Sequence, residues 1–399
     1  MDWYAATLFK REPVLTFEGA SKRGKEFFAE FTDDCDVCGT PLAELLRKQF
    51  IAALVHGRSY ILVDFPKASQ KVLTRAEEDA LGLARAYLSG YTAHDLINWS
   101  RDDRGQFEWV VLRQVNAHRR EFESSEERTE TRWMYFDREN YRIYRSTEIQ
   151  GKRSEPELVD EGAHGLCAEK IVPLFELKVS EGLWLLNKAA LLQLEHFNKS
   201  NGLAYALSMG LFAMPVVYTE RPWKEMIGES YYLHLGPGDR FGWTEPEGKV
   251  FQIAADNLTR LQEEVYRVCY LLHQALGSNS NGFAQSGLSK QRDFGITQEV
   301  LRAYGDMVKD FAKKILRAIG AVRQDELTID VSGLDDFDIG DFSSDLADAE
   351  RLLGMGIESP TLKAQVFKKL ASKYLCDVRQ ELKDRINGEI DASLLEKAS

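Results

Sequence analysis

The chain has 399 residues, of which 44% are hydrophobic and 29% are charged. This composition is ordinary for a soluble globular protein, and the length indicates two or more packed units. The formal net charge of −12 argues against a protein that grips nucleic acid over its whole surface by neutralising phosphates. It is compatible with a protein that lets DNA slide past.

Signals for a membrane span, for secretion and for structural zinc are missing from the sequence. Its most apolar run, residues 202–217, contains Pro215 and falls short of the roughly 20 residues that span a bilayer. We therefore interpret this run as a buried interface helix. The first residues lack a basic region followed by an apolar core, so we expect no secretion. Of the five cysteines only Cys35 and Cys38 lie close together, which predicts reduced thiols and no zinc site.

The first third of the chain has the pattern of an α+β fold. Apolar residues at helical spacing predict a helix over residues 42–55, and an apolar run closed by Pro66 predicts a buried strand over residues 59–66. Apolar and polar side chains alternate between residues 107 and 145, in segments joined by turn-forming residues. This alternation predicts an antiparallel meander with one face wet.

From Val179 onward the sequence becomes mainly helical. A first helix ends at Pro215, and we place five of its apolar residues near one stripe, namely Leu185, Ala189, Leu192, Leu194 and Phe197. An insert rich in glycine and proline follows over residues 215–248, and its composition predicts short strands and turns.

The remaining elements are two amphipathic helices and a helical tail. One helix is expected over residues 257–276 with Asp256 as its cap, and a second over residues 289–319 with a kink at Gly295 and a stop at Gly320. Between them lies the polar, nearly uncharged stretch "LGSNSNGFAQSGLSKQ", residues 276–291. Ser359 and Pro360 predict the start of a terminal helix that runs to about residue 387.

Catalytic motifs are missing from this long chain. Gly277 and Gly282 have the spacing of a phosphate-binding loop, but Phe283 and Ala284 stand where that motif needs Lys and Ser or Thr. Four acidic residues depart from the calcium-loop pattern, so we interpret them as a solvated turn; they are Asp335, Asp336, Asp338 and Asp341. We expect no enzyme, cofactor or metal, and we keep as an alternative a hydrolase or nuclease in which His56, Asp64 and His94 converge.

The order of elements after Val179 carries a resemblance to a known family. An apolar helix, a compact insert, a second amphipathic helix, a polar loop, a long helix, an acidic turn and terminal helices follow one another, as in the portal proteins of tailed bacteriophages. Residues 245–272 resemble the clip-to-stem passage of that family, and residues 282–320 resemble its loop-to-wing passage. Residues 52–66 and 91–100 are similar to passages in the wing of one portal group.

The resemblance implies a mainly helical α+β fold with seven parts. These are a wing (1–180), a first stem helix (181–212), a clip (213–252), a second stem helix (253–276), a tunnel loop (277–288), a long wing helix (289–335) and crown-like C-terminal helices (336–399). It also implies a virion protein that is assembled in the host cytoplasm as a ring, usually of twelve copies, at one capsid vertex. Its partners would be double-stranded DNA, the major capsid protein, the terminase motor and a head-tail connector or adaptor.

Two groups of residues are candidates for contacts in such a ring. The tunnel loop would offer small neutral groups to moving DNA: Ser278, Asn279, Ser280, Asn281, Gly282, Gln285 and Ser286. Two cations, Lys290 and Arg292, would follow at the start of the next helix. The clip would offer aromatic anchors to a docking partner: Trp223, Tyr231, Tyr232, Phe241 and Trp243. The alternatives are an ordinary interhelical connector, the small core of the clip, and a minor head or adaptor protein.

Overall fold

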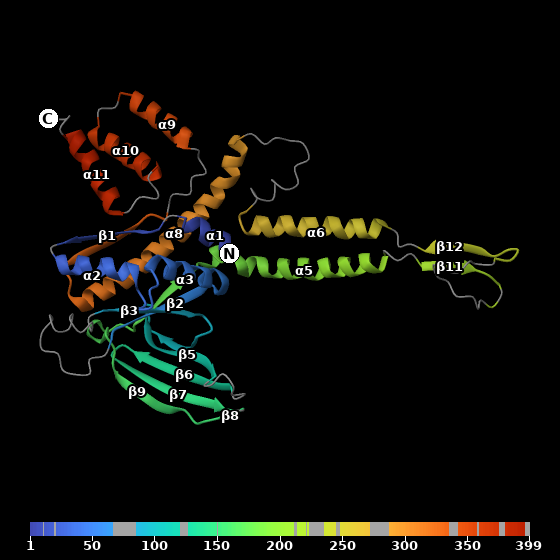
Figure 1. Cartoon of the computed structure of the whole chain (residues 1–399), viewed down its shortest axis with the longest axis horizontal. Coiled ribbons are helices and arrows are strands. Elements are labelled where there is room, and N and C mark those ends of the chain that lie inside the picture. Colours follow the sequence, from blue (N-terminus) through green and yellow to red (C-terminus); the bar gives the residue numbers. More distant parts are fainter. Residues whose placement is uncertain are drawn as a thin grey trace.

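The computed structural model shows a body, a long helical hairpin that projects from it, and a group of C-terminal helices (Figure 1). The described residues are 1–10, 12–19, 21–66, 85–119, 127–149, 151–210, 214–220, 222, 235–244, 248–271, 287–334, 342–356, 359–374 and 380–395.

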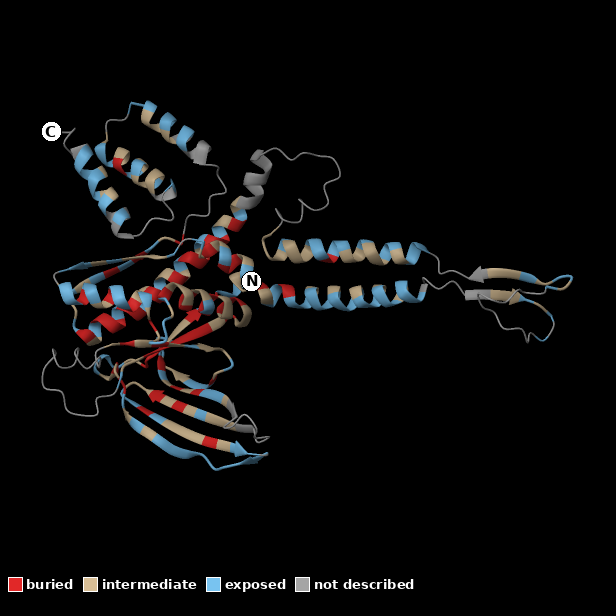
Figure 2. Ribbon diagram, viewed as in Figure 1, coloured by how far each residue is buried: buried red, intermediate tan, exposed pale blue. Residues whose placement is uncertain are grey.

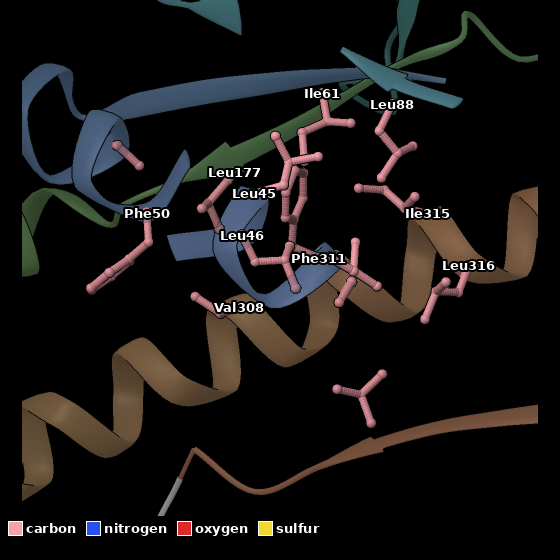
Figure 3. Close-up of a cluster of buried hydrophobic side chains, with 14 of the residues drawn as sticks. Leu45, Leu46, Phe50, Ile61, Leu88, Leu177, Val308, Phe311, Ile315 and Leu316 are labelled. Atoms are coloured by element: carbon pink, nitrogen blue, oxygen red, sulfur yellow. The ribbon is translucent and has the colours of Figure 1, made fainter. Parts of the chain in front are cut away.

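The helices of the body pack around one large apolar core. They are α1 (Asp2–Leu8), α2 (Lys22–Asp33), α3 (Leu42–His56) and α8 (Gly287–Arg323). Figure 3 shows Leu45, Leu46 and Phe50 of α3 in one apolar cluster with Val308 and Phe311 of α8. Helix α3 ends at His56, as the spacing of apolar residues predicted to within a residue, and the left-handed φ of 79° at Gly57 lets the chain turn into a strand.

Helix α8 is longer than its sequence predicted. Its 37 residues correspond to about 55 Å, and it is continuous through Gly295. The prediction that Gly320 ends this helix is wrong. The helix continues to Arg323 because the Arg323 guanidinium bridges Asp325 at 2.8 Å and lies 3.6 Å from the Phe27 ring, and the left-handed residue is Gln324 (φ 54°).

Two small antiparallel sheets complete the body. One has the order β10 (Leu174–Lys178), β2 (Arg58–Asp64), β3 (Tyr87–Thr92), and the other pairs β1 (Val14–Gly19) with β13 (Leu327–Ser332). Strand β2 is the buried strand that the sequence predicted, and it packs on α3. The pairing of β1 with β13 joins the start of the chain to the segment that follows α8.

The predicted antiparallel meander is confirmed as part of a six-stranded sheet. Its strands are β4 (Leu96–Arg101), β5 (Phe107–Arg119), β6 (Glu127–Asp137), β7 (Asn140–Ile149), β8 (Lys152–Arg153) and β9 (Glu157–Ala163). One face packs on the three-stranded sheet, where Leu112, Met134 and Phe136 meet Tyr60 and Leu174 in a second core. The two cores lie on the two faces of the three-stranded sheet.

The projecting hairpin consists of α5 (Leu185–Gly210) and α6 (Gly248–Val268), with the two-stranded ladder of β11 (Met214–Tyr218) and β12 (Arg240–Thr244) at its tip. The expected bounds of the second helix are wrong at both ends. Helix α6 begins at Gly248 instead of after Asp256, and it ends at Val268, where residues 269–271 turn back toward α8 and Tyr270 has a φ of 55°.

The tail forms three helices, α9 (Phe342–Gly354), α10 (Pro360–Tyr374) and α11 (Gln380–Leu395). The predicted start at Pro360 is confirmed, and the Leu362 N–H donates to Ser359 Oγ at 3.3 Å. The prediction of one continuous terminal helix is wrong, because α10 and α11 are separate and pack on one another through the Lys368–Asp391 ion pair (2.6 Å).

Within the described ranges, no helix is long and apolar enough to cross a membrane. The chain is therefore an α+β protein in which long helices and curled antiparallel sheets are combined.

Candidate subunit interface on the helical hairpin

Helix α5 carries apolar side chains on two opposite faces. Each residue turns the helix by about 100°, so Leu194 lies about 180° from Leu185. The prediction of a single stripe is therefore wrong. Residues on the first face are buried or half-buried toward the body and α6: Leu185, Ala189, Leu192, His196, Ser200 and Leu203.

The second face of α5 points away from α6 and is exposed. It carries Leu191 (78% exposed), Leu194, Tyr205 (70%) and Met209 (62%). These four side chains lie within about 60° of one another around the helix axis, and we call them the outer stripe. Figure 2 shows the hairpin mostly in the colours of exposed and half-buried residues, in contrast to α3 and α8 of the body, where many residues are red. An exposed apolar stripe of this length is typical of a protein interface.

Helix α6 is amphipathic in the ordinary sense. Leu258, Leu261 and Val265 follow the predicted spacing, face α5, and include the buried Leu261. Lys199 donates to Asn257 Oδ1 at 3.0 Å, which fixes the antiparallel alignment of the two helices. The opposite face of α6 is charged and polar, with Asp256, Arg260, Glu263 and Arg267 among its residues.

Near the tip, α6 also exposes two apolar side chains. Val250 and Ile253 are 64% and 61% exposed. The pairing of residue 199 with residue 257 places Tyr205 opposite about residue 251, so Val250 and Ile253 lie at the same height as Tyr205 and Met209. The hairpin therefore has two different exposed apolar patches at one height.

Hydroxyl groups of the body hold the base of the hairpin. Tyr304 donates to the carbonyl of Leu183 just before α5 (2.6 Å), and Tyr4 donates to the carbonyl of Cys269 just after α6. Thr297 donates to the Tyr270 carbonyl at 2.5 Å. Burial raises the pKa of the Tyr4 and Tyr304 hydroxyls, so both stay protonated donors. The bonds to Cys269 and Tyr270 supply donors to carbonyls just past the C-terminal end of α6, and the bond to Leu183 holds the chain where it enters α5.

The aromatic candidates at the tip are only partly described. Phe241 is half-buried in β12 opposite Val217, and Trp243 is paired in the same ladder with Pro215. Trp223, Tyr231 and Tyr232 lie outside the described residues. The ladder therefore brings two of the five candidates into one short strand, and the other three stay a prediction.

Most tunnel-loop candidates also lie outside the described residues, from Ser278 to Ser286. Lys290 and Arg292 belong to the first turns of α8, the next described helix after α6 in the sequence. The acidic residues Asp335, Asp336, Asp338 and Asp341 are likewise outside the described ranges.

The proposed catalytic grouping does not come together. The rings of His56 and His94 lie 4.6 Å apart at one end of the β2–β3 pair, but Asp64 is at the other end, about 20 Å along β2. There the Tyr87 hydroxyl donates to Asp64 at 2.8 Å. Among the residues that the structure describes, no group of three or more His, Cys, Asp or Glu side chains is arranged to hold a metal ion.

Cys35 and Cys38 lie in different environments within one turn. Cys35 is buried and Cys38 is exposed in the loop between α2 and α3, where Asp36 Oδ1 accepts from the Cys38 and Thr40 amides at 2.9 and 3.1 Å. Burial raises the pKa of Cys35 to about 12, so this thiol stays protonated and unreactive at neutral pH.

Sequence reasoning missed the outer stripe, although a helical-wheel count of residues 191–209 would have separated it from the inner face. It also missed the hydroxyls of Tyr4, Thr297 and Tyr304. Their partners are up to 265 residues away in sequence, so no local pattern reveals them.

Comparisons with known proteins concern the fold. No family model and no curated protein matches this chain. The chain is similar to one in the solved structure "Neck of empty GTA particle computed with C6 symmetry", with a TM-score of 0.52, 11% identity, and coverage of 92% of this chain and 88% of that chain. A chain of "Virion of native gene transfer agent (GTA) particle" has a TM-score of 0.49 at 10% identity, over 91% and 86%. At 11% identity, the first likeness establishes a shared fold over most of both chains.

Proposed function

We propose that this chain is a portal protein, a non-enzymatic ring at one vertex of a phage-like capsid. DNA would enter and leave through the channel of the ring, while the packaging motor and a tail connector dock on the tip of the hairpin. The chain would be part of the virion, in contact with the major capsid protein, after assembly in the host cytoplasm.

The observation that carries this proposal is the outer stripe of α5. A helix that is apolar on two opposite faces needs a cover on both, and α6 covers only one. A second copy of the chain can supply the other, because an obligate interface resembles a core divided between two chains. The resemblance of the element order to portal proteins, and the fold shared with a chain of a GTA particle neck, support the same conclusion.

The two apolar patches of the hairpin indicate how copies would meet. The outer stripe lies on α5 and the Val250–Ile253 patch lies on α6, so the first patch of one copy can meet the second patch of the next copy. We infer a head-to-tail contact in which Tyr205 and Met209 of one copy pack on Val250 and Ile253 of the next. Head-to-tail contacts generate rings when the rotation closes.

The charge of the chain suits a conduit. Twelve copies, the number usual in the family, would carry 12 × (−12) = −144 formal charges. Each neutralised phosphate adds salt-dependent binding, so a ring of tight cationic contacts would hold DNA in place, whereas an acidic wall would keep the duplex centred. Residues 277–288, polar and nearly uncharged, would then touch the backbone weakly, with Lys290 and Arg292 next to them.

The first experiment measures the size of the particle. Light scattering and electron microscopy of the purified full-length chain should show a large ring. Leu194→Glu combined with Met209→Glu should leave a folded monomer, because two buried carboxylates would oppose the interface. The matched control is Gln193→Glu, which adds a carboxylate to another face of α5 and should assemble like the wild type. A wild-type chain that stays monomeric or dimeric contradicts the proposal.

The second experiment tests the head-to-tail contact by disulfide cross-linking. In a background in which Cys38, Cys167 and Cys376 are changed to serine, Tyr205→Cys with Ile253→Cys should give a ladder of linked copies up to the full ring. Either cysteine alone should give no cross-linked dimer. A double variant whose linked products stop at the dimer would instead indicate a two-fold contact.

The third experiment concerns residues 278–285. Their deletion should leave ring assembly intact and should impair DNA packaging or retention. If the deletion abolished assembly, the tunnel-loop assignment would be wrong.

The rival functions are a hydrolase or nuclease and a minor head or adaptor protein. The separation of Asp64 from the His56–His94 pair removes the grouping on which the first rested. A minor head or adaptor protein does not require two helices that bracket an insert, whereas in this chain α5 and α6 bracket residues 211–247.

A further inference from the structure

On the face that points away from the three-stranded sheet, the six-stranded sheet carries a row of one arginine, two aromatic residues and one leucine. Arg113 of β5 pairs in register with Trp133 of β6, Trp133 pairs with Tyr144 of β7, and Tyr144 pairs with Leu158 of β9. Leu112 and Met134, one residue away on each of the first two strands, are buried in the core between the sheets. Side chains alternate along a strand, so these four point to the opposite, solvent side, and we call them the outer row.

The outer row is continuous and only partly covered. Adjacent strands are about 4.8 Å apart, so its four side chains extend over about 14 Å. Leu158 is 47% exposed and Arg113 is exposed, while Trp133 and Tyr144 are half-buried. Next to the row, the rings of Trp109 and Tyr135 stack with centroids 6.2 Å apart, which extends the aromatic surface along the strands.

Two arginines of this surface have no carboxylate partner among the residues that the structure describes. The Arg153 guanidinium lies 4.9 Å from the Trp133 ring centroid and its Nε donates to Ser146 Oγ at 3.4 Å. Neither Arg113 nor Arg153 forms an ion pair with any acidic residue that the structure describes, whereas Arg142 on the same face lies 3.8 Å from Glu161.

The opposite face of the same strands behaves differently. There Arg132 bridges Glu130 at 2.6 Å and Arg145 bridges Glu157 at 2.7 Å. Among the described residues, Arg132 and Arg145 are thus paired on one face, whereas Arg113 and Arg153 near Trp133 on the other face are not. Arginine, tryptophan and tyrosine clustered in this way are the residues that dominate binding energy at protein interfaces.

We infer that the outer row binds an acidic segment of a partner protein. A carboxylate of that segment would accept from the Arg113 and Arg153 guanidinium groups, and neighbouring apolar side chains would lie over Tyr144 and Leu158. Guanidinium and carboxylate match in a two-bond geometry, which makes such a pair both strong and specific.

Nucleic acid fits this surface less well. The Trp133 face on which a base would stack is already occupied by Arg153. Arg113 and Arg153, on a chain of net charge −12, also offer few phosphate contacts. This inference does not depend on the portal assignment.

The test selects random peptides of about twelve residues, displayed on phage, on the full-length chain, with removal of those that also bind an Arg113→Glu variant. Peptides with Asp or Glu beside Leu or Phe should be enriched. Synthetic copies should bind with a change in tryptophan fluorescence, and Arg113→Glu should weaken them by about tenfold or more. Arg145→Glu, the same charge change on the opposite face, should leave their affinity unchanged.

Several outcomes would overturn the inference. One is a selection that yields no peptides that depend on Arg113, or only basic ones. Another is that the synthetic peptides bind Arg145→Glu as poorly as Arg113→Glu, which would indicate a general charge effect. An oligo(dT) probe that binds the wild type but not Arg113→Glu would assign the surface to nucleic acid. Both variants change exposed or partly exposed arginines, so circular dichroism should confirm an unchanged fold before binding is compared.

Discussion

At the scale of single residues, two glycines of α8 have opposite roles. A Cβ added at Gly305 would lie 2.2 Å from the Leu334 carbonyl oxygen, so the glycine lets the segment after β13 cross the helix closely. A Cβ at Gly295 would meet nothing within 4 Å among the described residues. The first glycine is required by packing, and the second only lowers helix stability.

We therefore predict opposite effects of the same substitution. Gly305→Ala should destabilise the protein by about 1–3 kcal/mol, because the backbone carbonyl must move. Gly295→Ala should be neutral or stabilising by up to about 1 kcal/mol through helix propensity. Urea unfolding of both variants measures the difference, and equal effects would refute the close crossing at Gly305.

A buried histidine makes stability depend on pH. The Leu166 amide donates to His164 Nδ1 at 3.2 Å, so Nε2 carries the proton and donates to the Asp137 carbonyl at 3.0 Å. Burial lowers the pKa of His164, because the charged form loses its hydration.

The sign of the effect follows from proton binding. Below about pH 6.5, the ordinary pKa of histidine, the unfolded chain binds a proton that the folded chain takes up only at lower pH. The stability that neutral His164 contributes is thus fully present above that pH and is lost as the pH falls toward its folded pKa. In urea unfolding, the stability difference between wild type and His164→Gln should shrink as the pH falls from about 7.5 to about 5. A difference that is constant with pH would contradict this assignment.

At the scale of elements, the joint between hairpin and body depends on a few hydroxyl groups. Tyr304→Phe keeps the ring contacts with Tyr4 and Phe50 but leaves the Leu183 carbonyl without its donor. We expect a loss of about 1–2 kcal/mol in the free energy of unfolding. Tyr218→Phe is the control, since Tyr218 is exposed on β11, and it should change stability little. Denaturant titration of the two variants measures the difference in their free energies of unfolding.

The elements also show how far sequence reasoning reaches. Helix α3, strand β2 and the meander were predictable, because each buries one regular face and the spacing of apolar residues records it. Helix ends were less predictable. Arg323 extends α8 past Gly320 through contacts with Phe27 and Asp325, and α6 begins eight residues before Asp256, in the segment that follows the β11–β12 ladder. The outer row and the hydroxyls at the hairpin base join residues far apart in the chain, so only the fold reveals them.

At the scale of the whole molecule, the C-terminal helices are only loosely built into the chain. Among the side chains described in α9–α11, Ala364 is buried, while Phe367, Tyr374 and Leu382 are exposed. Among the described residues, the core of the body contains none beyond Leu334. We therefore expect the stability of the body to be independent of these helices.

A chain that ends after residue 334 should accordingly keep its fold. We expect its thermal midpoint to lie within about 2 °C of that of the full-length chain, because the main core is intact. Circular dichroism during heating measures this, and light scattering of the same sample shows whether the shortened chain still assembles. A large fall in the midpoint would mean that α9–α11 stabilise the body through contacts with it.

The anchored base of the hairpin has a mechanical consequence. Helix α5 has 26 residues, so its far end lies about 39 Å from its base, and a tilt of about 5° there would displace the tip by about 3 Å. That displacement is comparable to a hydrogen-bond length, enough to break or make a specific contact at the tip. The three hydroxyl bonds at the base thus fix the orientation of the hairpin relative to the body. A change in packing inside the body that alters these bonds would therefore move any partner bound at the tip.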